Sequence, residues 1–572
     1  MAAPTGGPTD RLDSWKEIAA YLGREVRTVQ GWEKTEGLPV HRHQHARLGS
    51  VYAFQSELDV WRAARRPAAG TEPAVEPDPP QARVLSGWRA AAAAVVCSVL
   101  ILGAGLALWQ KGRSTAAGGI PSSIVVLPFL DLSPERNQEY FSDGLTEEII
   151  DTLTRVPNLR VVARTSAFAF KGKPADIRRI GQQLNVAAVL EGSVRKAGDQ
   201  LRITAQLARV SDGYHLWSHT YDRRLKDIFA VQREISQAIA DQWRAGEVPR
   251  RGGPRDLETW HLYQEGRYFF NRFEPPDSDW KAIERYRQAL ARDPGFAQAY
   301  AGIADAYAYL AENFAMAPRE VMPRARDAAE KALALDDASA EAHVALGLIR
   351  LDYDRDRAGG QREFLRAIEL NPGLADARHW YAHSLEAQER LAEAMTEMRR
   401  ALDLDPLSIP IHWDIANELI CAGRYREALA ALDQAGELFP DIPVFPFLRL
   451  GVYQKTGDMA AAARTIADWR RRHPDEPADD PMLMSFYGLG AALGGSTAEA
   501  RRVVARMEDL RAGHYIDAFL ALPVCAALRD RGLQLRWLKR AVEDRSSMVV
   551  YLRLMKRVYG LDDALLTEAG VD

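Results

Sequence analysis

The sequence predicts a multidomain protein with a winged helix-turn-helix, one transmembrane helix, an α/β domain and an all-α repeat superhelix. Three observations predict this order. Residues 90–109 carry no charge, a pattern that alternates between strands and helices begins at Ser123, and prolines recur every 34 residues beyond residue 370. At roughly 100 to 200 residues per domain, a chain of 572 residues has room for several such parts.

The composition is that of an ordinary globular protein, with 47% hydrophobic and 27% charged residues. A formal net charge of -4 gives no general attraction to nucleic acid or membrane, so any such role must come from a local patch. The three cysteines, Cys97, Cys421 and Cys525, are too scattered for a disulfide framework or a cysteine-rich zinc module. The cysteines therefore do not indicate whether the chain resides in an oxidising or a reducing compartment.

The first predicted domain, residues 11–66, begins with two short helices. In SWKEIAAYL the apolar residues have helical spacing, Ser14 and Glu17 form a capping box, and Gly23 ends the helix. A second amphipathic helix, VRTVQGWEK, follows the tight turn. Two short helices joined in this way predict a helix-turn-helix, whose second helix enters the DNA major groove. The polar positions of that second helix are Arg27, Thr28, Gln30, Gly31 and Lys34.

A β-hairpin wing and a closing helix are predicted next. The alternation in VHRHQH, a turn near residues 47–49 and the run SVYAF indicate the hairpin, and SELDVWRAA indicates the helix. His41, His43 and His45 would project from one face of a strand. They suit either phosphate contacts or a metal site. Because no nearby cysteine or acid completes a tetrahedral set, phosphate contacts are favoured and no metal is predicted.

The segments LDSWKEIAAYLG, VRTVQGWEKTEGLP and SVYAFQSELDVW resemble the winged helix-turn-helix of the MerR and phage-excisionase families. That resemblance implies that the second helix contacts bases and the wing contacts phosphates. With Lys34 added from the helix phase, the candidate DNA-binding residues are Arg27, Thr28, Gln30, Lys34, Arg42, His43 and Arg47. The family binds DNA as dimers, so a homodimer is expected, but its usual dimerisation helix is missing here. A protein-binding module is the alternative, because Lys and Arg barely outnumber Asp and Glu in this region.

A spacer and a membrane span are predicted between residues 67 and 110. Residues 67–87 form a Pro-rich linker that could extend to roughly 60 Å. The twenty uncharged residues 90–109, inside a predicted transmembrane helix of residues 88–110, match a bilayer core and have Trp88 and Trp109 at its edges. A buried core helix is the alternative. Two basic residues flank each side, so the charges give no orientation.

Residues 120–245 predict a compact α/β domain. Strand segments such as SIVVLPF, LRVVAR and AAVLEGSVRKA alternate with helical segments such as EEIIDTLTRV and DIRRIGQQL. Asp143 is the expected cap of the first helix, with Glu147 and Glu148 in its first turn, where the helix dipole favours acids. A cation site at Asp131 and these acids is the alternative. The segments YFSDGLTEEIIDTL, VVARTSAFAFKG and VAAVLEGSVRKAGDQLRITAQL resemble the amino-terminal α/β domain of TolB, which implies no catalytic residue.

Residues 255–545 predict an array of helical repeats. Pro372, Pro406, Pro440 and Pro474 are 34 residues apart, and small residues such as Ala394 and Ala428 keep the same period. The pattern resembles the tetratricopeptide repeat, with about six regular units to residue 474 and two degenerate ones beyond it. The resemblance implies a superhelix whose concave face binds proteins or peptides.

These parts favour a bacterial, membrane-anchored, one-component transcriptional regulator. DNA would be bound in the cytoplasm, residues 90–109 would cross the inner membrane once, and the α/β domain and repeats would lie outside the cytoplasm as a sensor. The alternative is a membrane-bound scaffold that binds proteins through its repeats and does not bind DNA. With no Walker loop, HExxH motif or nucleophile elbow, we expect no enzyme, catalytic residue, cofactor or metal.

Overall fold

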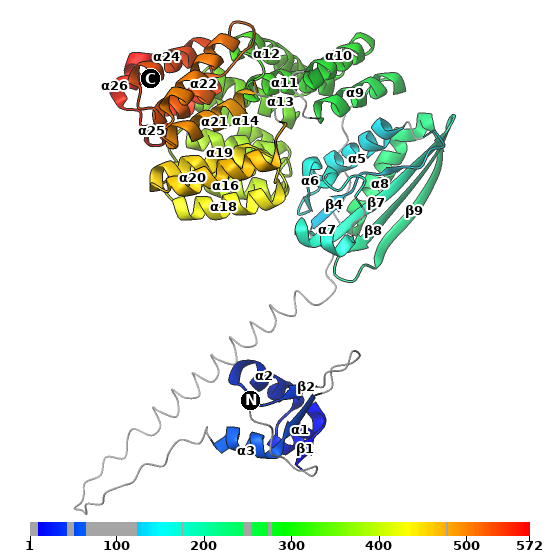
Figure 1. The fold of residues 1–572 in the computed structure, drawn as a ribbon. Coiled ribbons are helices and arrows are strands. Elements are labelled where there is room, and N and C mark those ends of the chain that lie inside the picture. Colours follow the sequence, from blue (N-terminus) through cyan, green and yellow to red (C-terminus); the bar gives the residue numbers. More distant parts are fainter. Residues whose placement is uncertain are drawn as a thin grey trace, which may run out of the picture. The chain divides into compact units, whose positions relative to one another are not determined.

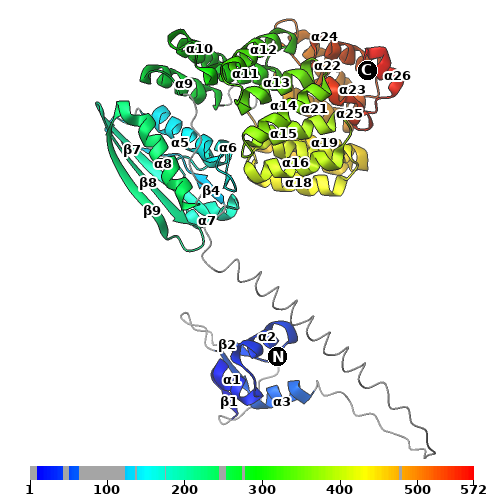
Figure 2. The same ribbon diagram turned by 180° about the vertical axis from the view of Figure 1, so that it is seen from behind.

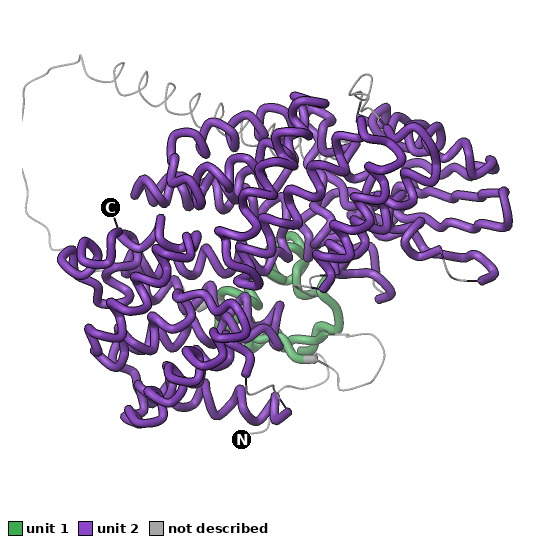
Figure 3. The backbone as a smooth tube through the Cα atoms, turned by 90° about the horizontal axis from the view of Figure 1, so that it is seen from above, with its two compact units in different colours: residues 1–112 green, residues 113–572 purple. Residues whose placement is uncertain are grey.

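The computed structural model describes residues 10–42, 51–63, 123–135, 138–173, 176–243, 253–272, 277–475 and 479–571. The chain divides into two compact units, residues 1–112 and residues 113–572 (Figure 3). The predicted linker and the predicted transmembrane helix, residues 67–87 and 88–110, lie outside the described residues. Within the ranges given above, no helix combines the length and the apolar character that a membrane span requires.

The first unit combines three helices with a small antiparallel sheet. The helices are α1 (Trp15–Leu22), α2 (Val26–Glu36) and α3 (Gln55–Ala63), and the sheet has the order β1 (Arg11–Leu12), β3 (Val51–Phe54), β2 (His41–Arg42). Ile18, Val29 and Leu58, one from each helix, are fully buried in the core. The predicted helices and the pairing of β2 with β3 are therefore confirmed, whereas the two-residue strand β1 is too short to leave a sequence pattern.

The capping of α1 differs in one detail from the predicted capping box. The Ser14 hydroxyl accepts a hydrogen bond from the Glu17 backbone N–H at 3.2 Å, as expected. The Glu17 carboxylate, however, accepts from the backbone N–H of Asp13 at 2.8 Å rather than from that of Ser14. Gly23 ends the helix with a left-handed backbone, φ +62°.

The second unit begins with an α/β region. Its sheet has the order β6-β4-β7-β8-β9, and β5 also pairs with β7. The strands are β4 (Ser123–Val126), β5 (Leu130–Asp131), β6 (Arg160–Val161), β7 (Ala188–Ala197), β8 (Gln200–Arg209) and β9 (His215–Arg224). The helices are α5 (Glu139–Leu153), α6 (Arg164–Phe168), α7 (Ile177–Gln183) and α8 (Ile228–Gln242). Strand β4 is parallel to its neighbours β6 and β7, whereas β8 is antiparallel to its neighbours β7 and β9. Helices α5 and α8 lie together on one face of the sheet (Figure 1).

The prediction that Asp143 caps a helix is wrong. Helix α5 begins four residues earlier, at Glu139, because Phe141 and Leu145 extend its fully buried apolar face. Asp143 and Glu147 consequently lie inside the helix, each with only 3% of its surface exposed. Their charges are balanced by side chains from later segments rather than by the helix dipole.

The rest of the second unit is an array of paired helices (Figure 2). In the described part of the chain they are α9 (Leu257–Phe270), α10 (Asp277–Arg292), α11 (Ala297–Glu312), α12 (Pro318–Leu335), α13 (Ala340–Leu348), α14 (Arg357–Leu370), α15 (Ala375–Glu386), α16 (Leu391–Leu404), α17 (Ile409–Cys421), α18 (Tyr425–Leu438), α19 (Val444–Thr456), α20 (Met459–Arg472), α21 (Pro481–Leu493), α22 (Thr497–Leu510), α23 (Ala518–Ala527), α24 (Arg531–Asp544), α25 (Leu552–Tyr559) and α26 (Asp563–Ala569). The short helices η2 (Ile349–Tyr353) and η3 (Ser547–Tyr551) interrupt the series. The chain is thus multidomain, with a mostly helical, tetratricopeptide-like array and a smaller sheet region.

The helical array extends beyond its predicted end at residue 545. Helices α25 and α26 continue it to Ala569, and η3 brings this segment back to the early repeats. The Tyr551 hydroxyl donates a hydrogen bond to the Asp352 carboxylate at 3.0 Å, and the Arg545 guanidinium lies 4.6 Å from the centre of the Tyr353 ring. The last helices therefore pack against η2.

The α/β region and the repeats are joined by direct contacts. Trp260 of α9, 1% exposed, packs edge-on against Phe141 of α5 and belongs to the core beneath the sheet. At the other end of the contact, the Ala163 backbone N–H donates to the Leu404 carbonyl at 2.8 Å, and Arg160 donates to the Asp403 carbonyl at 2.6 Å. The junction thus fixes α5 and α6 against α9 and α16.

Candidate functional site

In the first unit, helix α2 presents polar side chains to solvent. Arg27, Thr28 and Lys34 are exposed, whereas Gln30 is half-buried. Val29 lies on the buried side of the same helix. Three predicted DNA-binding residues therefore lie where a large ligand can reach them, and their contact with DNA stays a prediction.

The predicted wing is described only at its base. Arg42 lies in β2 opposite Val51, and His43 and Arg47 lie outside the described residues. The Nε2 atom of His41 is 2.7 Å from the Glu57 carboxylate of α3, and its ring stacks on Tyr52 at 5.2 Å. Helix α3 thus brings an acid, Glu57, to His41 from sixteen residues away, whereas His43 and His45 lie outside the described residues.

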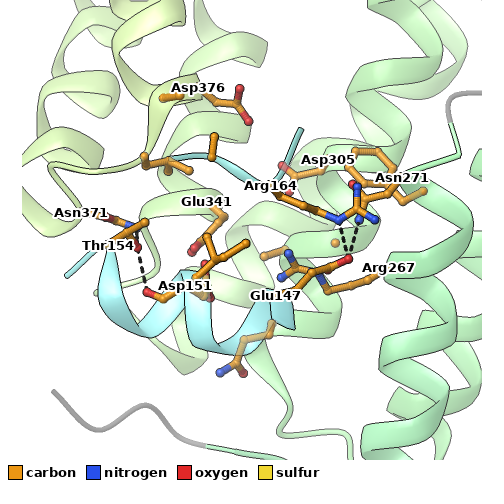
Figure 4. Close-up of a pocket in the computed structure, with 18 of the residues that line it drawn as sticks. Glu147, Asp151, Thr154, Arg164, Arg267, Asn271, Asp305, Glu341, Asn371 and Asp376 are labelled. Carbon is orange, nitrogen blue, oxygen red and sulfur yellow. Dashed lines mark hydrogen bonds and ion pairs between the residues drawn. The ribbon is translucent and has the colours of Figure 1, made fainter. Parts of the chain in front are cut away.

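In the second unit, a pocket of about 190 Å³ lies between α5 and α6 of the α/β region and the first helices of the repeats (Figure 4). Small-molecule sites usually measure about 300–1,000 Å³, so this pocket suits a single long side chain better than a cofactor. Six carboxylates line it against only two guanidiniums. The acids are Glu147, Asp151, Asp305, Glu341, Asp376 and Asp405, and the bases are Arg164 and Arg267.

Two guanidiniums hold Glu147 in the lining of the pocket. Buried Glu147 forms ion pairs with Arg164 of α6 and, at 2.7 Å, with the Nε atom of Arg267 of α9 (Figure 4). Burial by itself would raise the pKa of Glu147, but the two guanidiniums lower it below its ordinary value. Nearby, Lys171 pairs with Asp143, whose pKa burial nevertheless raises to about 6. Through these ion pairs Glu147 and Asp143 connect α5 to later segments of the chain. The structure therefore supports neither a helix-start role nor a free cation site at Glu147.

The repeats contribute three further acids to the pocket. Asp305 of α11, Glu341 of α13 and Asp376 of α15 come from three successive repeats (Figure 4). Glu341 lies 3.6 Å from the Arg155 guanidinium. Neither Asp305 nor Asp376 has a hydrogen bond or ion pair to any of the residues that the structure describes. Burial, and next the charges of Glu341 and Asp376, raise the pKa of Asp305.

Asp405 lines the pocket where α6 meets the end of α16. Its carboxylate accepts hydrogen bonds from the backbone N–H and the hydroxyl of Ser166, and burial raises its pKa to about 6. The Ser166 hydroxyl in turn accepts from the Leu407 backbone N–H at 2.7 Å. This network holds the α/β region on the repeats.

Apart from Glu147, the acids of this pocket have no sequence motif that marks them as a site. One signal was present: Asp305 is the sole acid in the apolar and alanine-rich run from Phe296 to Ala311. A single charge in such a helix indicates a special environment, since burying an unpaired carboxylate is costly. Its neighbours Glu341 and Asp376, however, are brought to it only by the stacking of the repeats.

Comparison with known proteins gives partial matches. No family model matches the chain. A protein of Rhizobium meliloti (strain 1021), provisionally named adenylate cyclase 3, is 39% identical over 233 residues, which are 40% of each chain. The transcriptional regulator HilA of Salmonella typhimurium is 23% identical over 238 residues, 40% of this chain and 42% of HilA. The chain thus spans about two-fifths of the length of these curated relatives.

Among solved structures, the human IFIT1 dimer with m7Gppp-AAAA has a TM-score of 0.39 and 15% identity to this chain. The superposition covers 60% of this chain and 76% of that one.

Proposed function

We propose that this chain is a protein-interaction scaffold whose repeats bind a basic segment of a partner protein at the acidic pocket. The observation that carries the proposal is the convergence of Asp305, Glu341 and Asp376 from three successive repeats on one small pocket. Repeat arrays use such combined surfaces to bind extended segments of other proteins. A lysine or arginine side chain would supply an ion-pair partner for Asp305 and Asp376, which form none with the described residues.

The size of the pocket supports a side chain as the ligand. About 190 Å³ is too small for most cofactors but sufficient for one long basic side chain. The ion pairs of Glu147 with Arg164 and Arg267 would keep that part of the lining fixed while a ligand enters.

The test uses the full-length chain and a library of peptides in which one position is fixed as Arg, Lys, Gln or Glu. We expect selection of the basic peptides, with binding that weakens as salt is added. Asp305→Asn and Asp376→Asn should each weaken binding about tenfold or more, because a hydrogen bond to a charged group contributes about 1.5–3 kcal/mol.

Asp327→Asn is the matched control for this test, since Asp327 is an exposed acid of α12 outside the pocket. Equal binding of the Arg and Gln peptides, or equal loss in the control, would rule out the pocket as the recognition site.

A second candidate is a membrane-anchored transcriptional regulator. The exposed Arg27, Thr28 and Lys34 on α2 favour it, as does the partial match to HilA. In this proposal residues 90–109 cross the inner membrane, the first unit binds DNA in the cytoplasm, and the second unit binds its partner on the other side.

Two measurements test the second candidate. The full-length chain should bind selected fragments of its own genome in a salt-sensitive way, and Arg27→Ala should weaken this binding while Arg62→Ala on α3 should not. A reporter fused after residue 245 should respond as an extracytoplasmic protein. Absence of DNA binding at low salt would exclude the regulator and leave the scaffold proposal. A reporter that responds as a cytoplasmic protein would exclude the proposed single crossing of the membrane.

A further inference from the structure

A second polar cluster lies within the repeats, away from the acidic pocket. His379 and His383 are one turn apart on α15, and Asp414 lies on α17 of the next repeat. One ligand atom from each residue lies within 4.8 Å of the others. The Nε2 atoms of His379 and His383 are 2.7 Å and 3.1 Å from the same oxygen, Oδ2 of Asp414.

We propose that His379, His383 and Asp414 bind a divalent transition-metal ion such as Zn²⁺. Two imidazoles and a carboxylate are typical ligands for these ions, and a fourth position can hold water. Ligand atoms in a tetrahedral zinc site lie roughly 3.3 Å apart. The two N–O separations of 2.7 Å and 3.1 Å therefore need to open by about 0.2–0.6 Å to admit the ion.

A further contact orients His383 for this role. Its Nδ1 atom lies 2.8 Å from the carboxylate of Glu386, while its Nε2 atom faces Asp414. Histidines that bind metals usually donate the other ring N–H to a carboxylate or a carbonyl, which fixes the tautomer and the ring orientation. Glu386 thus acts as a positioning residue for His383.

The charges around the cluster also favour a cation. Glu418 lies one turn beyond Asp414 on α17, is only 3% exposed, and has an Oε2 atom without a hydrogen-bond partner in the described structure. With Glu386 and Asp414 it gives three carboxylates against two imidazoles. A bound divalent cation would supply the charge that this buried carboxylate lacks.

The site would lie beneath the C-terminal segment. The ring of Tyr551 is 5.6 Å from that of His383, and Tyr551 is hydrogen-bonded to Asp352 of η2. An ion held by α15 and α17 would therefore lie where consecutive repeats and the last helices meet, and it should stabilise the folded array.

The experiment is a titration of the chelator-treated full-length chain with Zn²⁺, followed by Co²⁺ as a spectroscopic probe. Asp414→Asn should remove one binding site and its Co²⁺ ligand-field bands, and Glu386→Gln should lower the affinity of that site about 10–100-fold. Zn²⁺ should raise the Tm of the wild type but not that of Asp414→Asn.

His343→Gln is the matched control. His343 lies 2.6 Å from Glu363 and is as buried as His383, but it belongs to no cluster of three ligands among the residues described. This control should bind Zn²⁺ as the wild type does. Zn²⁺ that binds elsewhere, for example to the N-terminal histidines, contributes equally to both proteins and does not affect the comparison. Equal stoichiometry and affinity in the wild type and Asp414→Asn would overturn the proposal and leave the cluster as a metal-free ion-pair network.

Discussion

The regular repeats and the C-terminal segment of the second unit are both helical, but different contacts hold them. In α15 and α16 the contacts are local: Ala382, Ala394 and Ala401 are fully buried where neighbouring helices cross. Residues 546–571 depend instead on contacts between distant parts of the chain, such as that of Tyr551 with Asp352, 199 residues away. A repeat period therefore predicts the local contacts between neighbouring helices, but it does not specify how the last helices pack.

The largest expected effect tests this distant contact. Tyr551→Ala should lower the free energy of unfolding by about 3–5 kcal/mol, since it removes a buried aromatic ring. Tyr551→Phe should cost about 1–3 kcal/mol, because it keeps the ring but leaves the buried Asp352 carboxylate without its donor. Denaturant unfolding of the full chain measures both.

Tyr381→Phe in the regular α15 is the control for Tyr551→Phe. Tyr381 is half-buried and none of the residues that the structure describes forms a hydrogen bond with its hydroxyl. Its substitution should leave stability almost unchanged. Equal effects of the two substitutions would show that the hydrogen bond between Tyr551 and Asp352 does not contribute to stability.

A smaller, pH-dependent effect tests the junction at Asp405. Burial raises its folded-state pKa to about 6, above the unfolded value, so the folded state holds the proton more tightly. Stability from this group is therefore greatest at low pH and is lost as pH rises through the folded pKa. Between about pH 5 and about pH 8, the free energy of unfolding of the wild type should fall by about 1.4 kcal/mol relative to that of Asp405→Asn. Unfolding curves at several pH values measure this difference, and parallel pH profiles would contradict the assignment.

The smallest expected effects concern two glycines of the regular repeats. Gly423 links α17 to α18 with φ +73° and open space around it, so Gly423→Ala should cost about 1 kcal/mol through backbone strain alone. Gly451 also has open space but lies inside α19, so Gly451→Ala should stabilise the chain by up to about 1 kcal/mol. Thermal unfolding of both variants checks the opposite signs, and a stabilising Gly423→Ala would exclude the strain argument.

Sequence patterns predicted the elements whose signals are local. The helices around Ile18 and Val29, the long hairpin of β7 and β8, and the 34-residue repeats all follow from apolar periodicity and turn residues. The start of α5 was misplaced because Asp143 and Glu147 have the composition of a helix start. Only the folded chain brings Lys171, Arg164 and Arg267 to these acids.

The acidic pocket and the histidine cluster could not be predicted for the same physical reason. Each site takes its residues from separate repeats, and the pattern of one repeat does not specify which polar side chains of the next will face it. Asp305 meets Glu341 and Asp376, and His383 meets Asp414, only after the helices have stacked.

The contact of the last helices with η2 also bears on how the array unfolds. In an open solenoid each repeat contacts only its neighbours, so the ends can fray while the centre stays folded. Here Arg319 of α12 pairs with Asp544 of α24 at 3.1 Å, and Phe314 stacks on Phe519 at 6.1 Å. The last helices cannot loosen without breaking their contacts with α12 and η2, so these parts of the array should unfold together.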